Sequence, residues 1–248
     1  MSSSLTTWKN LPRISGSRIA VLTGAGVSAE SGIPTFRGNG GYWKQHRFED
    51  LATPEAFARD PKFVWTWYEE RRRTIAAARP NAGHEALVEM EKRAASFTLI
   101  TQNVDGLHEL AGSKNVIRLH GSIWEVRCLK CDEERIDRSE FDNLPPRCEC
   151  GGMLRPGVVW FGESLPEGAM ERATAAVKAA DVLIVAGTSA QVYPAAGLIP
   201  LATTVIEINP EATAFSEQVT YSIRGSSAEI LPQLLARDVA PPLVGRVP

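Results

Sequence analysis

Apolar residues along the chain form short continuous runs, separated by stretches with helical spacing. Buried strands of a parallel sheet are covered on both faces, so they are apolar throughout rather than at alternate positions. Helical stretches between such strands predict an α/β fold with a doubly wound parallel sheet. The predicted strands are 18–22, 97–101, 116–119, 181–186 and 203–208, and the predicted helices are 81–94, 167–180 and 226–235.

Two stretches interrupt this alternation and predict a small second lobe. One is helical and aromatic and covers 34–80, and the other covers 124–156 and contains every cysteine of the chain. The large lobe then consists of about 14–33, 81–123 and 157–236, and both lobes belong to one domain that spans 1–248. The last segment, 237–248, contains two consecutive prolines and is expected to be a frayed tail.

The cysteines occur as two close pairs, Cys128-x-x-Cys131 and Cys148-x-Cys150, with sixteen residues between the pairs. Two such pairs on facing turns can supply the four thiolates of a tetrahedral zinc site. The alternative is four buried thiols without a metal. Disulfide frameworks are typical of short secreted chains, so we predict a structural zinc ion and a cytosolic protein.

The composition limits the possible partners. The chain has 248 residues and a net charge of −2, which gives no electrostatic reason to expect nucleic acid or a membrane surface as partner. No apolar run approaches the roughly 20 residues that a membrane-spanning helix needs.

Glycine and polar residues follow the predicted strands, where ligands of doubly wound sheets bind. The first strand leads into Gly24-Ala25-Gly26-Val27-Ser28-Ala29, which fits the loose pattern of dinucleotide-binding turns. A tight turn without a ligand has the same pattern. A dehydrogenase would also have an acidic residue after a second strand about 20 residues later. That region is Gly40-Gly41-Tyr42-Trp43-Lys44 and is not a strand, which disfavours a dehydrogenase.

The later strands are followed by Gln102-Asn103-Val104-Asp105, by His120, by Gly187-Thr188-Ser189 and by Asn209. His120 is the histidine at this edge of the sheet, whereas His84 and His108 lie in helical patterns and are expected to be structural. Asp105 is either a helix cap or a ligand-binding carboxylate. Together these residues predict one polar crevice.

The helix that follows Asp60-Pro61 has an apolar stripe of Val64, Tyr68 and Ile75, and Arg71 falls on this stripe. Arg72 and Arg73 are expected to face away and to be solvated. Either Arg71 extends from the edge of the stripe to solvent, or Tyr68 and Arg71 together present a hydroxyl and a guanidinium to the cleft, where arginine can take a carboxylate in two parallel hydrogen bonds.

Six segments, in order, resemble the sirtuin (Sir2) family over nearly the whole chain, from Arg18 to about Leu235. They are Gly24 to Arg37, Thr101 to His108, Leu119-His120-Gly121, the two cysteine pairs and Gly187-Thr188-Ser189. The resemblance implies a Rossmann-like NAD-binding lobe, a small lobe of zinc ribbon and helices, and NAD⁺-dependent deacylation of lysine side chains in proteins or peptides. The products would be nicotinamide, 2′-O-acyl-ADP-ribose and free lysine.

Roles are implied by position in the matching motifs. His120 would be the general base, and Asn103 would be a second catalytic residue that lines the nicotinamide pocket with Asp105. The segment Val158 to Glu163 would pair as a strand with the substrate peptide, and the cysteines would hold zinc. The substrate residues would be Tyr68, Arg71, Val158, Val159, Phe161 and Gly162. NAD⁺ would contact Gly24, Ala25, Gly26, Ser28, Glu30, Thr35, Phe36, Arg37, Trp43, Gln102, Asn103, Val104, Asp105, His120, Gly187, Thr188, Ser189, Asn209, Pro210, Glu211 and Ser227.

Tyr68-x-x-Arg71 and Gly38-Asn39-Gly40-Gly41-Tyr42-Trp43 are similar to the class III subgroup, which removes succinyl and malonyl groups. Bacterial members with this pair often remove acetyl groups too, so dual activity is expected. The alternatives are a deacetylase only, a protein mono-ADP-ribosyltransferase, or a module that senses NAD⁺ without turnover.

Overall fold

The computed structural model describes residues 10–36 and 47–239. Its larger sheet has six parallel strands in the order β3-β2-β1-β7-β8-β9, so the strand order reverses between β1 and β7. Thr23, the last residue of β1, is level with Thr101 of β2 and Ala186 of β7, so these three strands end together. The strands are β1 (Arg18–Thr23), β2 (Ser96–Thr101), β3 (Val116–Arg118), β7 (Val182–Ala186), β8 (Val205–Ile208) and β9 (Tyr221–Ile223).

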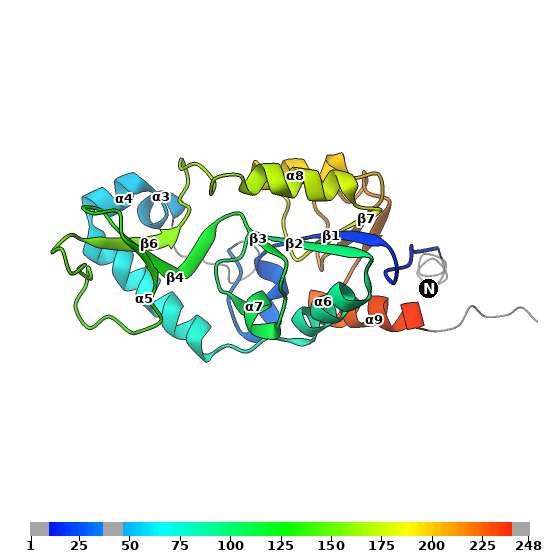
Figure 1. Ribbon diagram of the computed structural model, residues 1–248, viewed down its shortest axis with the longest axis horizontal. Helices are drawn as coiled ribbons and strands as arrows, with labels where there is room; N and C mark the ends of the chain where they lie inside the picture. Colours follow the sequence, from blue (N-terminus) through cyan, green and yellow to red (C-terminus); the bar gives the residue numbers. More distant parts are fainter. Residues whose placement is uncertain (1–9, 37–46, 240–248) are drawn as a thin grey trace, which may run out of the picture.

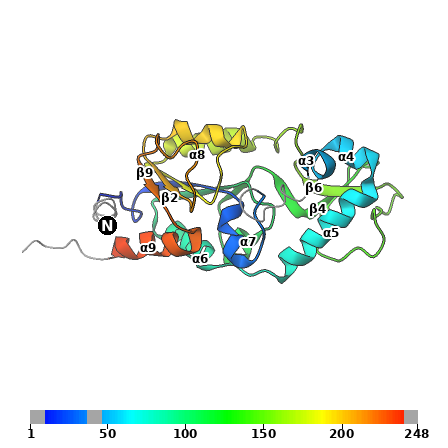
Figure 2. The same ribbon diagram turned by 180° about the vertical axis from the view of Figure 1, so that it is seen from behind.

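Helices cover both faces of this sheet, as Figures 1 and 2 show. Alternate residues of β1 enter different cores: Ile19 and Val21 belong to one cluster, and Ala20 and Leu22 to the other. The first cluster includes residues of α6 and α9, and the second includes residues of α8 and η3. The helices of this lobe are η1 (Ala25–Val27), η2 (Ala29–Ser31), α6 (Ala82–Arg93), α7 (Leu107–Ala111), α8 (Ala169–Ala179), η3 (Ala195–Leu201) and α9 (Ser227–Val239).

The small lobe packs helices against an antiparallel sheet with the order β5-β4-β6, to the left in Figure 1. Its core contains the fully buried Trp65 of α5, together with Ile123 and Leu154 of the sheet. Two helices begin with the same device, a capping side chain followed by proline: Thr53 accepts from Ala56 N and Asp60 from Phe63 N. The elements are α3 (Phe48–Leu51), α4 (Pro54–Arg59), α5 (Pro61–Ala77), β4 (Gly121–Cys128), β5 (Glu134–Ile136) and β6 (Leu154–Val158).

The predicted α/β fold is confirmed, and one local prediction needs correction. The glycine turn after β1 leads into two short 3-10 turns, η1 and η2. Strand β6 ends at Val158, and beyond it Phe161 N donates to Ala52 O and Gly162 has a φ of +88°; pairing of this segment with a peptide stays a prediction. Finally, α9 continues to Val239, since Arg237 donates to Leu11 O and Asp238 accepts from Ser15 N; the rest of the predicted tail lies outside the described residues.

No helix in the described part of the chain combines the length and apolar content that crossing a bilayer requires.

Candidate active site

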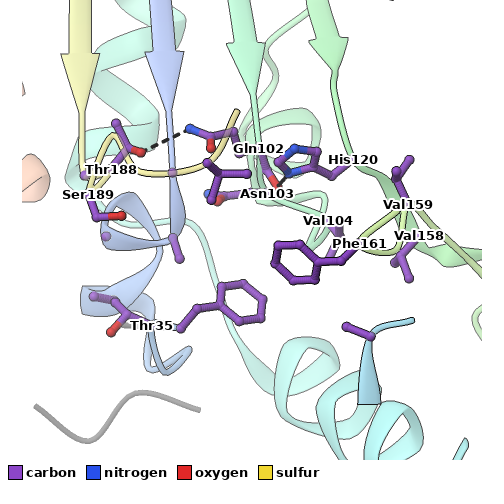
Figure 3. Close-up of a pocket in the computed structure, with 18 of the residues that line it drawn as sticks. Thr35, Gln102, Asn103, Val104, His120, Val158, Val159, Phe161, Thr188 and Ser189 are labelled. Atoms are coloured by element: carbon purple, nitrogen blue, oxygen red, sulfur yellow. Dashed lines mark hydrogen bonds between the residues drawn. The ribbon is translucent and has the colours of Figure 1, made fainter. Parts of the chain in front are cut away.

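A cavity of about 550 Å³ opens at the carboxyl ends of the parallel strands and continues to helix α5 of the small lobe. This size is in the range of small-molecule sites, and the cavity lies at the reversal of strand order, where doubly wound sheets bind ligands. Figure 3 shows His120 and Val159 at one side and Thr188 and Ser189 at the other. The sequence-predicted residues that line it are Gly24, Ala25, Gly26, Glu30, Thr35, Phe36, Tyr68, Arg71, Gln102, Asn103, Val104, His120, Val158, Val159, Phe161, Gly162, Gly187, Thr188, Ser189, Asn209, Pro210 and Glu211.

Three predicted residues in the described part of the chain are not in this wall. Ser28, Asp105 and Ser227 are buried behind it, and the neighbouring Ser226 reaches the cavity instead of Ser227. Arg37 and Trp43 lie outside the described residues.

The glycine turns after β1 and β7 pack directly against each other. Gly26 N donates to Gly187 O at 2.8 Å, and Gly24 N donates to Ala186 O at 3.1 Å. A Cβ at Gly26 would lie 2.8 Å from the Gly187 Cα, and a Cβ at Gly187, where φ is +60°, would lie 2.4 Å from Val27 N. Glycine is therefore required at this crossing by chain packing as well as by access to the cavity.

The side chain of Gln102 links the ends of the strands. Its Nε2 donates to Thr23 O at 3.3 Å and to the Thr188 hydroxyl at 3.1 Å, the bond drawn in Figure 3. Asn209 extends the link, because its Nδ2 donates to Thr188 O at 3.3 Å. Hydrogen bonds from these two side chains thus connect the ends of β1, β2, β7 and β8 and hold the wall of the crevice in place.

The hydrogen bond that His120 makes to the backbone determines its protonation. Nδ1 lies 3.1 Å from Gln102 O. A carbonyl oxygen can only accept, so Nδ1 carries the proton and Nε2 is left as an acceptor. Burial lowers the pKa of His120, and the bond to Gln102 opposes this shift. The ring is therefore neutral at pH 7 and can accept a proton.

Asn103 is held by a buried pair behind the wall. Its Nδ2 lies 3.4 Å from the Ser28 hydroxyl, which donates to the Asp105 carboxylate at 2.8 Å. Asp105 also accepts from Leu107 N, the first residue of α7, at 2.8 Å, although the N-cap residue of that helix is Gly106. Burial raises the pKa of Asp105, and its bonds to Leu107 and Ser28 oppose this shift. Ser28 and Asp105 thus support Asn103 from behind.

The far end of the cavity, at α5, is aromatic and cationic. Tyr68 and Arg71 are both buried, with 2% and 5% exposure, and both line the cavity. The guanidinium of Arg71 lies 4.7 Å from the centroid of the Trp67 ring and 4.9 Å from that of Phe36. Arg71 therefore does not extend to solvent, and its charge faces the cavity between aromatic rings.

Several wall residues were not named as site residues from the sequence, among them Trp67, which contacts Arg71, and Trp160, which contacts Tyr68. Trp67 precedes Arg71 by four positions on α5, so the helical spacing that identified Tyr68 could have identified it too. Trp160 follows β6 and lines the cavity with Glu163. Its contact with Tyr68 spans 92 residues of sequence, so no local pattern reveals it.

Arg72 is buried, contrary to the prediction that it is solvated. Its exposure is 2%, and its guanidinium donates to the carbonyls of Ile123, Asp137 and Ser139 at 2.9, 2.9 and 2.7 Å. The reason is that α5 is covered on a second side by β4 and the chain that follows β5. Arg73 is exposed, as predicted, and pairs with Glu140.

The four cysteine thiols converge in the small lobe. All Sγ atoms lie within 4.8 Å of one another, and the pairs Cys128–Cys150 and Cys131–Cys148 are 3.5 and 3.7 Å apart. Tetrahedral zinc with bonds of about 2.3 Å requires sulfur separations of about 3.8 Å. The four thiols therefore fit a structural zinc ion.

His84 and His108 are buried and lie away from the cavity wall, as expected of structural residues. His84 Nδ1 accepts from Asn81 N at the start of α6, and His108 Nε2 lies 3.0 Å from the Thr23 hydroxyl. Burial lowers the pKa of His84 to about 4 and that of His108 to about 3.

Comparison with known proteins identifies the family. The Sir2 family pattern matches residues 24–194. An NAD-dependent protein deacylase of Aquifex aeolicus is 57% identical over 205 residues, which are 80% of this chain and 86% of the relative. A Sir2 homologue solved with NAD is 47% identical, with a TM-score of 0.85 over 95% of this chain and 94% of that one. A Sir2 structure with a p53 peptide and NAD⁺ is 31% identical, with a TM-score of 0.80 over 95% and 97% of the two chains. The chain belongs to the Sir2 family.

Proposed function

We propose that the protein is an NAD⁺-dependent protein-lysine deacylase that removes succinyl and malonyl groups, and acetyl groups as well. The observation that carries the acyl preference is the buried pair of Tyr68 and Arg71 in the same cavity as His120. A guanidinium can take a carboxylate in two parallel charge-assisted hydrogen bonds. An acyl chain that ends in a carboxylate would bring such an anion to Arg71 in the cavity.

The crevice end of the cavity suits NAD⁺. Glycines 24, 26 and 187 leave the backbone open at the strand reversal, and Thr188, Asn209 and Glu211 offer polar groups beyond them. NAD⁺ supplies the ADP-ribosyl group that receives the acyl group as nicotinamide leaves.

His120 then takes a proton from a ribose hydroxyl through Nε2, because Nδ1 is engaged with Gln102 O. A neutral imidazole at a fixed orientation is suited to this transfer near pH 7. Asn103, held by Ser28, presents its amide at the same part of the wall.

The substrate peptide would lie along Val158 to Gly162, between the lobes, with its acyl-lysine directed toward α5. The Sir2 structure that contains a p53 peptide supports a peptide or protein as substrate. The cytosol is the proposed location, because four free thiols arranged for a metal fit a reducing compartment.

The test is the substitution Arg71→Met, assayed with otherwise identical acetyl-, succinyl- and malonyl-lysine peptides, with products followed by mass. A charge-assisted pair contributes about 2–3 kcal/mol, so kcat/KM for the acidic acyl groups should fall roughly 30- to 150-fold. Deacetylation should fall far less.

Arg73→Met is the matched control, because Arg73 is the same residue type two positions away on the exposed side of α5. It should leave all three activities unchanged. An equal loss of deacetylation and desuccinylation in Arg71→Met would show that Arg71 is structural. A wild-type protein that releases no nicotinamide with any peptide would refute the enzymatic proposal.

A further inference from the structure

The hydroxyl of Tyr68 is held by a residue of the segment that follows β6. Trp160 Nε1 donates to Tyr68 Oη at 3.0 Å, and the two side chains are 3% and 2% exposed. Both residues line the cavity, one from α5 and one from the predicted peptide-binding segment. This hydrogen bond therefore connects the acyl end of the cavity to the peptide side.

The chemistry of the two groups fixes the direction of the next hydrogen bond. An indole N–H can only donate, whereas a phenol hydroxyl can both accept and donate. The bond to Trp160 therefore uses an acceptor position of Tyr68 and leaves its proton available for an acceptor in the cavity. Burial also raises the pKa of Tyr68, which keeps the hydroxyl protonated.

Trp160 is itself held in place. The guanidinium of Arg155 lies 3.6 Å from the centroid of the indole ring, and Phe57 packs at 5.1 Å. Glu163 accepts from Trp160 N at 2.8 Å and pairs with Arg155 through both carboxylate oxygens. The charge of Arg155 is thus balanced by Glu163. The ion pair of Arg155 and Glu163 holds the indole in place, and Arg155 does not compete with Arg71 for an anion in the cavity.

We propose that Trp160 is a positioning residue for acyl selectivity: it orients Tyr68 so that the phenol proton is donated to the carboxylate of the acyl group beside Arg71. This inference rests on the proposed function. It assigns the preference for acidic acyl groups to Arg71 together with the hydrogen-bonded pair of Trp160 and Tyr68, and so to two segments rather than to α5 alone.

The test is a double-mutant cycle with Trp160→Phe and Tyr68→Phe, read as the ratio of kcat/KM for succinyl- and acetyl-lysine peptides. Trp160→Phe keeps an aromatic ring under Arg155 but removes the N–H together with part of the ring system, so a second Trp→Phe substitution is needed to control for the lost volume. The ratio should fall roughly 3- to 10-fold, as for the loss of one hydrogen bond, mainly through the KM of the succinyl peptide. In the Tyr68→Phe background the same substitution should have no further effect on the ratio.

Trp65→Phe is the control for general damage to the small lobe. Trp65 is fully buried in the same core and donates to Leu154 O at 2.8 Å, but it is not in the cavity wall. It should lower the melting temperature without changing the ratio. Glu163→Gln tests the same role independently. It weakens the ion pair with Arg155 that holds Trp160 in place, and it should therefore also lower the succinyl-to-acetyl ratio of kcat/KM.

Three results would overturn the positioning role: an unchanged ratio in Trp160→Phe, an effect of equal size in the Tyr68→Phe background, or an equal change of the ratio in Trp65→Phe. If one of these results is found and the wild type still turns over the succinyl peptide, only the positioning role is refuted, and the proposed function remains supported. If the wild type does not turn over that peptide, the acyl preference fails and the positioning role fails with it.

Discussion

The substitution Arg72→Met tests how the helical part of the small lobe is joined to the zinc module. Besides its three carbonyl acceptors, the Arg72 side chain pairs with Glu69 at 3.2 Å, and both side chains are 3% exposed. Its guanidinium also lies over the rings of Trp124 and Phe141. Methionine keeps the packing of the chain but leaves a buried carboxylate and the carbonyls without their donor.

Removal of one partner of a buried ion pair costs about 3–5 kcal/mol. For a domain of this size, a loss of about 4 kcal/mol lowers the melting temperature by roughly 8–16 °C. The measurement is urea and thermal unfolding, followed by tryptophan fluorescence because Trp124 lies under the guanidinium. Replacement of both partners, Arg72→Met with Glu69→Leu, should recover part of the loss, since no buried charge then remains unpaired.

Arg73→Met, the exposed neighbour, should stay within about 0.5 kcal/mol of the wild type. A loss below about 1 kcal/mol in Arg72→Met would refute the assignment of Arg72 as the link between the two parts of the lobe. A double variant less stable than Arg72→Met alone would refute the explanation by an unpaired Glu69.

Three further outcomes are expected. Removal of zinc with a strong chelator should unfold the small lobe and lower the melting temperature, because the metal fixes the two cysteine turns. The kcat/KM for deacylation should fall with decreasing pH, with an inflection below 6.5, because His120 must be neutral to accept a proton and burial lowers its pKa. The free energy of unfolding should decrease as the pH falls below 6.5, because His84 and His108 take up protons when the chain unfolds but stay neutral in the fold down to about pH 4 and 3.

Each of these has a clear counter-result. An unchanged melting curve after zinc removal would exclude a structural role for the metal. An inflection above pH 6.5 would contradict a desolvated His120. The histidine effect, of order 2 kcal/mol per residue between pH 6.5 and 5, is measured by urea unfolding at both pH values; equal stability at the two would show that these rings are hydrated.

The sequence predicted the large sheet well, because its buried strands are continuous apolar runs. The exception is β9, whose three residues Tyr221–Ile223 lie at the edge and include only one buried side chain. The family resemblance is confirmed by the matched pattern and the relatives, and the thiol cluster agrees with the cysteine spacing.

What the sequence could not predict depends on contacts between distant segments. A single apolar stripe implies one buried face, so Arg72 was expected in solvent although α5 is covered on two sides. Trp160 fell within the predicted peptide-pairing segment, but its contact with Tyr68 was not foreseen because the two residues are 92 positions apart. The placement of Ser28 and Asp105 behind the wall follows from their own hydrogen bond, which connects residues 77 positions apart.

The packing of Gly26 against Gly187 has a consequence for when the binding site forms. The two turns are far apart in the sequence, and each packs against the backbone of the other. Forming this contact requires that a long loop be closed, which costs conformational entropy. During synthesis, a nascent chain that has not yet exposed β7 therefore lacks this wall of the crevice, and binding of the nucleotide reports that the turn after β7 has packed against the turn after β1.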